Sequence, residues 1–381
     1  MTDGILIKRD TLPIVQKALA PGRVVVVYGP RRTGKTTLVS QLAAQSQSGA
    51  MLVSAEDIAV RDYLASESIE KLKAFVGASK LVVIDEAQHI RNIGLALKLM
   101  VDHIPGLSLV ATGSASFDLA RQTGQPLAGR QRTITLLPIS QRELSAFETA
   151  HETAARLEQR LVFGSYPEVV TASGDNERAA YLRELAGAYL FKDILEIEGV
   201  RRSDKLLRLL QLLAFQIGRD VSVDALGQDL GISRNTANRY LDLLEKAFVI
   251  YSRSGFSRNL RKEITKSRRY YFFDNGIRNA VINNFSPPAL RDDMGGLWEN
   301  YICVERIKRN LALETVPQSY FWRTHDQQEI DLVEDLDGRL SAFEMKFGRK
   351  TPAQPKAWKE AYPISSFNVI SRTNYLGVIT G

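Results

Sequence analysis

A short stretch near the N-terminus carries residue types that bind nucleotide phosphates. The run GPRRTGKT, residues 29–36, fits G-x-x-x-x-G-K-[ST] and lies between an apolar run and a helix-favouring run. Glycines at this spacing let backbone N–H groups point at phosphate oxygens, and the N-terminus of the following helix adds a favourable dipole. Lys35 is expected to reach the β- and γ-phosphates, and the Thr36 hydroxyl to ligate Mg²⁺. The residues expected to bind ATP are Gly29, Pro30, Arg31, Arg32, Thr33, Gly34, Lys35, Thr36 and Thr37.

Two adjacent acids follow a second apolar run, KLVVIDEAQH at residues 80–89. Asp85 suits the Mg²⁺ bound to ATP, and Glu86 suits polarisation of the attacking water. Acids favoured by a helix dipole are the alternative, and the phosphate-binding pattern upstream favours the catalytic interpretation. One strand, AMLVS at residues 50–54, lies between the two motifs, as in P-loop proteins that use a glutamate as the base.

Polar and basic residues follow the next apolar strand, LSLVATGSAS at residues 107–116. In AAA+-type ATPases a polar residue at this strand end senses the γ-phosphate. Similarity to these ATPases gives that role to Thr112 or Ser114. Capping of the strand end is the alternative. An arginine slightly further on often reaches the ATP of a neighbouring subunit in such families, and Arg130 is the candidate. Arg132 competes for this role, and an ordinary surface arginine is the alternative.

A basic segment lies in the second half of the chain. Residues 201–285 hold 16 Lys+Arg and 8 Asp+Glu, whereas the net charge of the whole chain is +7. This segment therefore carries the entire positive excess, which favours a polyanionic partner, nucleic acid first. A solvated basic face is the alternative.

Within this segment the pattern predicts three helices and then alternating strands and turns. The helices are expected at 203–218 and 222–231 and after Ser233, the expected N-cap of the third. This order predicts a winged helix-turn-helix, with the outward part of the third helix on DNA and a basic wing on the phosphates. A winged helix that binds protein is the alternative. The residues expected to contact DNA are Arg234, Asn235, Asn238, Arg239, Arg258, Arg261 and Lys262.

Carboxylates recur near the C-terminus. Glu344 and Lys346 lie on one face of a predicted strand, Asp331 ends the apolar part of the strand before, and Glu299 lies on a preceding helix. Helix, three strands, helix and strand is the layout of restriction-endonuclease-like domains, which need acids converging on Mg²⁺ and a nearby lysine. Asp331 and Glu344 would be the metal ligands, Lys346 the activating cation and Glu299 an auxiliary acid. A nuclease-like fold retained for binding or packing is the alternative.

Composition limits the class of protein. Hydrophobic residues make up 44% and charged residues 24%, as in globular domains. The single cysteine, Cys303, excludes an internal disulfide and fits a cytoplasmic location. No apolar run approaches the ~20 residues needed to span a bilayer, and no signal peptide or membrane association is expected.

The expected fold class is α/β. A doubly wound P-loop (AAA+-like) domain is expected at 1–147, with a helical lid at 148–203. A winged-helix DNA-binding domain at 204–286 and a small restriction-endonuclease-like α/β domain at 287–381 would follow.

Taken in order, the motifs resemble one known family. GPRRTGKT, VVIDEAQ, TGSAS, LAGR, GSYPEVV, FKDI, FFDNGIRNA and LWENYI…EIDLV…FEMKFG are similar to those of a large group of prokaryotic ATPases that pair an AAA+-like module with a C-terminal domain of unknown function. The resemblance covers nearly the whole chain. It implies an ATPase that binds DNA and forms a homo-oligomer, such as a hexameric ring.

The favoured function is therefore Mg²⁺-dependent ATP hydrolysis coupled to remodelling or movement of duplex or branched DNA. Two alternatives remain open. One is an ATP-gated DNA nuclease that uses Asp331, Glu344 and Lys346. The other is a nucleotide-switched regulator that binds DNA or a protein.

Overall fold

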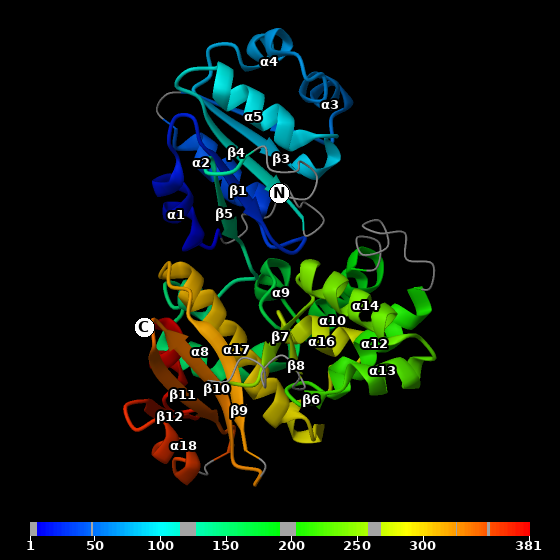
Figure 1. Ribbon diagram of the computed structural model, residues 1–381, viewed down its shortest axis with the longest axis vertical. Helices are drawn as coiled ribbons and strands as arrows, with labels where there is room; N and C mark the ends of the chain where they lie inside the picture. The colour runs from blue at the N-terminus through cyan, green and yellow to red at the C-terminus, as the bar shows by residue number, and fades with distance from the viewer. Residues whose placement is uncertain are drawn as a thin grey trace. The chain divides into compact units, whose positions relative to one another are not determined.

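The computed structural model describes residues 6–46, 49–114, 127–190, 203–257, 268–324, 326–348 and 351–381. The chain divides into two compact units after Pro138. We call residues 6–138 the N-terminal unit and residues 139–381 the C-terminal unit (Figure 1). This division precedes the predicted boundary at residue 147, and the segment 148–203, predicted as a lid, belongs to the C-terminal unit. The division into four domains stays a prediction.

The N-terminal unit is built on a five-stranded sheet in the order β2-β3-β4-β1-β5, with every strand parallel to its neighbours. This parallel sheet confirms the expected α/β class. The strand β4 separates β1 from β3 in space, so both lie in the middle of the sheet. The strands are β1 Val24–Tyr28, β2 Ala50–Ser54, β3 Leu81–Asp85, β4 Ser108–Gly113 and β5 Gln131–Thr135.

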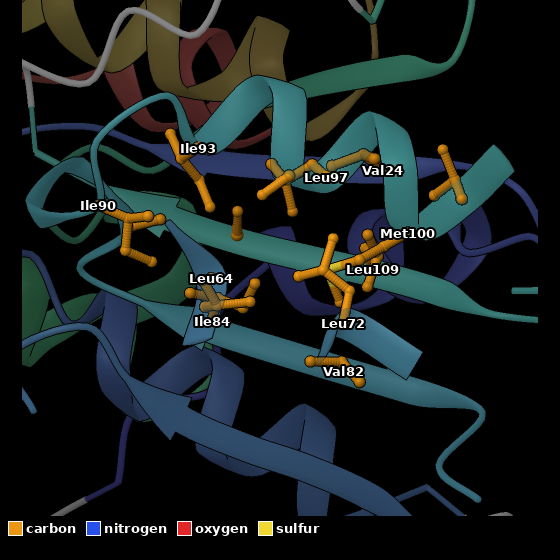
Figure 2. Packing of buried hydrophobic residues seen from close by; sticks show 14 of the residues in the cluster. Val24, Leu64, Leu72, Val82, Ile84, Ile90, Ile93, Leu97, Met100 and Leu109 are labelled. Atoms are coloured by element: carbon orange, nitrogen blue, oxygen red, sulfur yellow. The ribbon is translucent and has the colours of Figure 1, made fainter. Parts of the chain in front are cut away.

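Helices cover both faces of this sheet because the residues of β1 are apolar on both sides. Val25 and Val27 pack with residues of α1 and α2, whereas Val24 and Val26 pack with residues of α4 and α5. Figure 2 shows the second cluster, in which Leu97 and Met100 of α5 lie over the sheet. Both faces are therefore buried, as expected for a parallel sheet. The helices are α1 Thr11–Ala18, α2 Lys35–Ala44, α3 Ile58–Leu64, α4 Ile69–Val76, the short 3₁₀ turn η1 Ala87–His89 and α5 Ile93–His103.

The C-terminal unit begins with helices. They are α7 Gln141–Leu144, α8 Ala150–Phe163, α9 Pro167–Thr171, α10 Asp175–Glu184 and the π-helical turn η2 Leu185–Leu190. The helix α8 starts with a capping box, in which Thr149 and Glu152 satisfy each other's backbone N–H groups. Leu157 and Leu161 of α8 then pack in one core with α17 and the last sheet.

A three-stranded sheet and its helices come next. The elements are α12 Ser203–Phe215, β6 Asp220–Val221, α13 Val223–Leu230, α14 Arg234–Lys246, β7 Ile250–Ser254, β8 Arg268–Phe272 and α16 Asn275–Val281. The sheet has the order β6-β8-β7 and is antiparallel throughout. The three predicted helices are thus present.

The last part of the unit contains a four-stranded sheet in the order β12-β11-β10-β9. Only β11 and β12 are parallel to each other. The elements are the 3₁₀ turn η3 Pro288–Leu290, α17 Met294–Ala312, β9 Gln318–Arg323, β10 Glu329–Leu336, β11 Arg339–Met345, α18 Lys356–Ala361, β12 Ser366–Ile370 and α19 Tyr375–Thr380. Helix, three strands, helix and strand is the predicted order. Within the described ranges, no helix is long and apolar enough to cross a membrane.

Candidate functional site: a nucleotide loop and an acidic cavity

The loop between β1 and α2 is tightly curved. Gly34 has φ 88° and precedes α2, a backbone conformation that glycine adopts most readily. Gly29 lies so close to the backbone of Leu136 that a Cβ on Gly29 would be 2.1 Å from the Leu136 carbonyl oxygen. The Thr33 hydroxyl donates to the Pro30 carbonyl at 2.9 Å and closes the loop. The glycines of the motif are therefore required by the fold of the loop.

Lys35 lies inside this curve. Its side chain is buried, and its Nζ donates to the carbonyls of Gly29 at 3.0 Å and Pro30 at 2.8 Å. Phosphate oxygens carry more negative charge than carbonyls, so they are stronger partners for an ammonium. The remaining predicted loop contacts, Arg31 and Arg32, lie on the same loop, and Thr37 lies in the first turn of α2.

Three elements meet around Asp85 at the end of β3. Its carboxylate accepts a hydrogen bond from the Thr36 hydroxyl at 2.7 Å and another from the Thr112 hydroxyl of β4. The Thr112 oxygen in turn accepts the N–H of Glu86 at 3.0 Å. The structure thus brings together the predicted Thr36 and Asp85. These are the oxygen donors that Mg²⁺ prefers.

Glu86 has an unusual backbone. Its φ is 53°, in the left-handed region, and its half-buried side chain accepts a hydrogen bond from the Gln88 amide. Non-glycine residues in this region often mark functional turns. Of the two polar candidates on β4, Thr112 makes the contacts with both acids, while Ser114 is buried just beyond the strand. A sensing role for Ser114 stays a prediction.

Sequence reasoning missed Arg9. Its guanidinium is buried and donates to the Thr33 carbonyl at 2.7 Å and to the Leu137 carbonyl at 2.6 Å. The only signal in the sequence is a basic residue ahead of the first helix, and such residues are common on surfaces. The contact joins residues 24 and 128 positions apart, which no local pattern reveals.

Arg130 lies near the beginning of the parallel strands, at the opposite end from the phosphate-binding loop. Its carbonyl accepts the N–H of Val24 at the beginning of β1, whereas the phosphate-binding loop follows the end of β1. The five residues of β1 separate its two ends by roughly 16 Å. Its side chain forms an ion pair with Asp102 at 3.3 Å. Arg132 is the second residue of β5 and pairs with Val25 of β1. The structure does not bring Arg130 to Asp85 and Glu86 of its own chain, so its predicted role requires a second copy.

The predicted DNA contacts on α14 are exposed. Ser233 caps the helix by accepting the N–H of Thr236 at 3.1 Å, as predicted. Apolar residues of α14, such as Ala237 and Leu241, are buried. Four of the predicted contacts lie on the outer face, namely Arg234, Asn235, Asn238 and Arg239. The other three, Arg258, Arg261 and Lys262, lie outside the described residues.

A cavity of ≈ 640 Å³ lies within the C-terminal unit. Glu299 and Asp331 line it, together with Arg269 of β8. The Tyr271 hydroxyl donates to Glu299 at 2.7 Å, and the N–H of Met345 donates to Asp331 at 2.7 Å.

Glu344 and Lys346, the other two residues of the predicted nuclease set, form an ion pair with each other at 2.6 Å and do not line the cavity. The second oxygen of Glu344, Oε2, is buried and accepts no hydrogen bond from the residues that the structure describes. In the part of the chain that the structure describes, no three His, Cys, Asp or Glu side chains are placed to hold a metal ion together.

The electrostatics of these acids reflect burial and crowding. Burial, followed by the charges of Glu299 and Glu344, raises the pKa of Asp331 well above its usual value. Burial also raises the pKa of Glu299, against the hydrogen bond from Tyr271. Burial acts to lower the pKa of Lys346, but its hydrogen bond to Glu344 and the nearby carboxylates raise it. A cation beside Asp331 would relieve this repulsion.

Three family models match the chain. Residues 21–145 match an AAA domain. Residues 154–287 and 294–375 match two domains of unknown function, DUF8612 and DUF4143. The chain therefore contains an AAA-type domain that spans the nucleotide loop, Asp85 and Thr112.

Two relatives that resemble this chain carry the name of uncharacterized proteins. The protein Rv2008c of Mycobacterium tuberculosis is 30% identical over 93% of this chain and 77% of that protein. The protein MJ1544 of Methanocaldococcus jannaschii is 23% identical over 85% of this chain and 77% of that protein. A solved structure, the signal transduction ATPase with numerous domains (STAND) protein PH0952 of Pyrococcus horikoshii, is 12% identical with a TM-score of 0.31. That match covers 82% of this chain but only 48% of the other, and at this TM-score it supports no inference about the fold.

Proposed function

This chain belongs to the family of the mycobacterial protein Rv2008c, and we propose that it is a Mg²⁺-dependent ATP hydrolase. The observation that carries the proposal is the hydrogen-bonded set Thr36–Asp85–Thr112 next to Lys35. Thr36 and Asp85 would hold Mg²⁺, which neutralises charge on the β- and γ-phosphates when it is bound. The match of residues 21–145 to an AAA domain supports the same activity.

The residues of the chain have separate roles in this proposal. Lys35 exchanges the carbonyls of Gly29 and Pro30 for phosphate oxygens. Glu86 polarises the attacking water. The hydrogen bond that its backbone N–H donates to Thr112 and the one that its carboxylate accepts from Gln88 orient it. Removal of such a positioned group costs 10²-fold or more in rate, by order of magnitude.

We further propose that ATP turnover is coupled to DNA bound by α14. The order of α12, β6, α13, α14, β7 and β8, with a small antiparallel sheet, supports a winged helix. The exposed polar residues of α14 and the net charge of +8 in residues 201–285 support a nucleic-acid partner. DNA remodelling or movement, on duplex or branched DNA, is the process that such coupling would serve.

The test is ATP hydrolysis measured across a panel of single-stranded, duplex and branched DNA. We expect stimulation that is lost in the double variant Arg234→Ala/Arg239→Ala. The matched control is Lys356→Ala, an exposed cation of the same unit with a side chain that is 86% exposed. Equal rates with and without every DNA would overturn coupling but not hydrolysis. Tight, sequence-specific binding with slow turnover and a weak salt dependence would indicate a nucleotide-switched regulator instead.

A homo-oligomer is part of the proposal because Arg130 lies far from Asp85 and Glu86 of its own chain. We propose that Arg130 acts on the ATP of a neighbouring copy, as in a hexameric ring. Mixing inactive Arg130→Ala and Lys35→Ala chains should restore hydrolysis, because the first keeps an intact loop and the second keeps Arg130. The double variant Lys35→Ala/Arg130→Ala is the control partner. Absence of restored activity, with no change of mass on adding ATP, would contradict this role.

ATP-gated cleavage of DNA is a second candidate function. The observation that favours it is the buried Oε2 of Glu344, which has no hydrogen-bond partner among the described residues. It lies beside Asp331, whose pKa is raised by burial and neighbouring acids. Asp331 and Glu344 would hold a divalent ion that supplies an activated water when bound, with Glu299 as an auxiliary acid. We expect Mg²⁺- or Mn²⁺-dependent cutting that Lys346→Ala abolishes and Lys359→Ala, at an exposed lysine of α18, does not. No cutting on any DNA of the panel, with and without ATP, would remove this candidate.

A further inference from the structure

The connection between the two units is short and held on both sides. In the N-terminal unit, the Leu137 carbonyl accepts the Arg9 guanidinium at 2.6 Å. In the C-terminal unit, the Ile139 N–H donates to the Ser165 carbonyl at 3.0 Å, and its carbonyl accepts the Lys308 ammonium at 3.0 Å. Only Pro138 lies between, and its ring restricts φ. The connection therefore has little freedom to absorb a displacement of Leu137.

The same connection touches the nucleotide loop at two places. The Leu136 carbonyl lies against Gly29, at a distance that leaves no space for a Cβ. The Arg9 guanidinium, which donates to Leu137, also donates to the Thr33 carbonyl at 2.7 Å. The Gly29 end of the loop thus contacts Leu136 directly, and the Thr33 end is linked to Leu137 through the Arg9 side chain.

Nucleotide binding changes the partners of this loop. Lys35 holds the carbonyls of Gly29 and Pro30, and a phosphate would draw the ammonium away from them. These carbonyls must then find other donors or reorient. Because the Arg9 side chain is buried, loss of either of its acceptors is costly, and Thr33 and Leu137 are kept at a fixed separation. A shift of the loop is therefore passed on to Leu137.

We propose that Arg9 is a positioning residue that transmits nucleotide occupancy from the loop to the Leu137–Ile139 connection, so that ATP changes the arrangement of the two units. This inference rests on the proposed binding of ATP. It assigns a role to Arg9 that is separate from contact with the nucleotide itself.

The test is energy transfer between one dye on each unit of the full chain. Lys73→Cys and Lys359→Cys provide exposed attachment sites, while the native Cys303 is buried and burial raises its pKa to about 12. Energy transfer is measured without nucleotide and at saturating ATP on the Glu86→Gln background. Nucleotide affinity is measured separately with a fluorescent ATP analogue, so that each variant is compared when it is fully occupied.

We expect a nucleotide-dependent change of energy transfer in the parent chain, reduced at least threefold in Arg9→Ala and in Arg9→Lys. The reason is that Arg9 reaches the two carbonyls with two different guanidinium nitrogens, whereas lysine has one nitrogen on a shorter side chain. Lys8→Ala, the adjacent exposed cation, should retain the full change. Pro138→Gly, which leaves Arg9 intact but frees φ, should also reduce it and serves as the test if the Arg9 variants do not fold.

Two results would overturn the proposal. One is a full change of energy transfer in folded Arg9→Ala, or in Pro138→Gly where the Arg9 variants do not fold. The other is a parent chain that binds ATP with no change at all, which would leave the proposed hydrolase standing. Failure of the parent chain to bind ATP would overturn both proposals, and the affinity measurement identifies that case.

Discussion

Asp85 in the N-terminal unit and Asp331 in the C-terminal unit both lie on strands inside a sheet and both are buried, yet their surroundings differ. Asp85 accepts hydrogen bonds from two hydroxyls, those of Thr36 and Thr112. Asp331 accepts one backbone N–H and lies in the fields of two other carboxylates, Glu299 and Glu344.

This difference teaches how a buried acid is prepared for a cation. Hydroxyl donors stabilise a carboxylate without competing charge, and a hydroxyl can itself become a metal ligand. Crowded carboxylates instead favour protonation, unless a cation neutralises them. In the first arrangement hydroxyl donors of the chain stabilise the charge, whereas the second keeps carboxylates that repel one another close together.

The largest expected effect contrasts the same substitution at both acids. Asp85→Asn should lower the rate of ATP hydrolysis by about 10²–10³-fold, because the proposed Mg²⁺ ligand loses its preorganised charge. Asp331→Asn should leave that rate within about twofold, since Asp331 belongs to the other unit. Phosphate release with saturating Mg²⁺ measures both. Equal losses would break the comparison.

At a third buried acid, Asp274, the effect of hydrogen bonds on stability can be tested separately from the effect of crowded carboxylates. Asp274 accepts the N–H groups of Ser165 at 2.8 Å, Gly276 at 2.8 Å and Ile277 at 3.2 Å. Asp274→Ala leaves these donors unmet and should lower the free energy of unfolding by about 3 kcal/mol. Asp274→Asn, which retains one acceptor oxygen, should lose less. Denaturant unfolding of the full chain measures this, and equal loss in both variants would contradict the assignment.

The effect of Asp274 should also depend on pH. Burial raises its pKa to about 6, against the charge of Lys308 and the three N–H groups. Because this value is above that of the unfolded chain, the extra stability is present at low pH and is lost as pH rises through about 6. The difference between wild type and Asp274→Ala should therefore shrink between pH 4 and pH 8.

A smaller effect sharpens the role of the hydroxyls around Asp85. Thr112→Val removes the hydroxyl that contacts both acids while keeping the shape of the side chain, and should lower hydrolysis about tenfold, or ~1.4 kcal/mol. Thr112→Ser restores the hydroxyl and should recover most of the rate. A rate that depends on the methyl group rather than the hydroxyl would show that packing, not hydrogen bonding, matters at this position.

The smallest expected effect concerns the crowded acids. Glu299→Gln keeps an acceptor for Tyr271 but removes one charge, and should raise the free energy of unfolding by about 1 kcal/mol at pH 8 without divalent ions. Since burial raises the pKa of Glu299, wild type loses stability as pH rises through that pKa, and the gap between the two proteins should widen with pH.

Divalent ions provide the control for this last prediction. Mg²⁺ or Mn²⁺ should raise the thermal midpoint of wild type more than that of Glu299→Gln. A bound cation neutralises the crowded acids, and the variant has one acid fewer. Glu360→Gln, at an acid with a side chain that is 67% exposed, is the matched variant. No difference between Glu299→Gln and Glu360→Gln would argue against a cation site beside Asp331.

Local patterns in the sequence predicted much of this architecture. The spacing of Gly29, Gly34, Lys35 and Thr36 predicts a curved loop before a helix, because those residues act on the backbone next to them. The AAA-domain match and the parallel sheet confirm that interpretation at the level of the domain. The helix cap at Ser233 was predictable for the same reason, since the N–H it satisfies is three residues away.

Contacts between distant segments were decided by the tertiary structure alone. The order β3-β4-β1 brings Asp85 to Thr36. The parallel pairing of β1 and β5 places Arg130 at the end of the strands opposite the loop. Arg9 reaches Leu137 across 128 positions. The sequence by itself determined which residues are able to bind phosphate and metal, because that depends on side-chain chemistry and local backbone. Which of these residues lie together was decided by strand order and direction, because these determine the end of the strands at which each side chain lies.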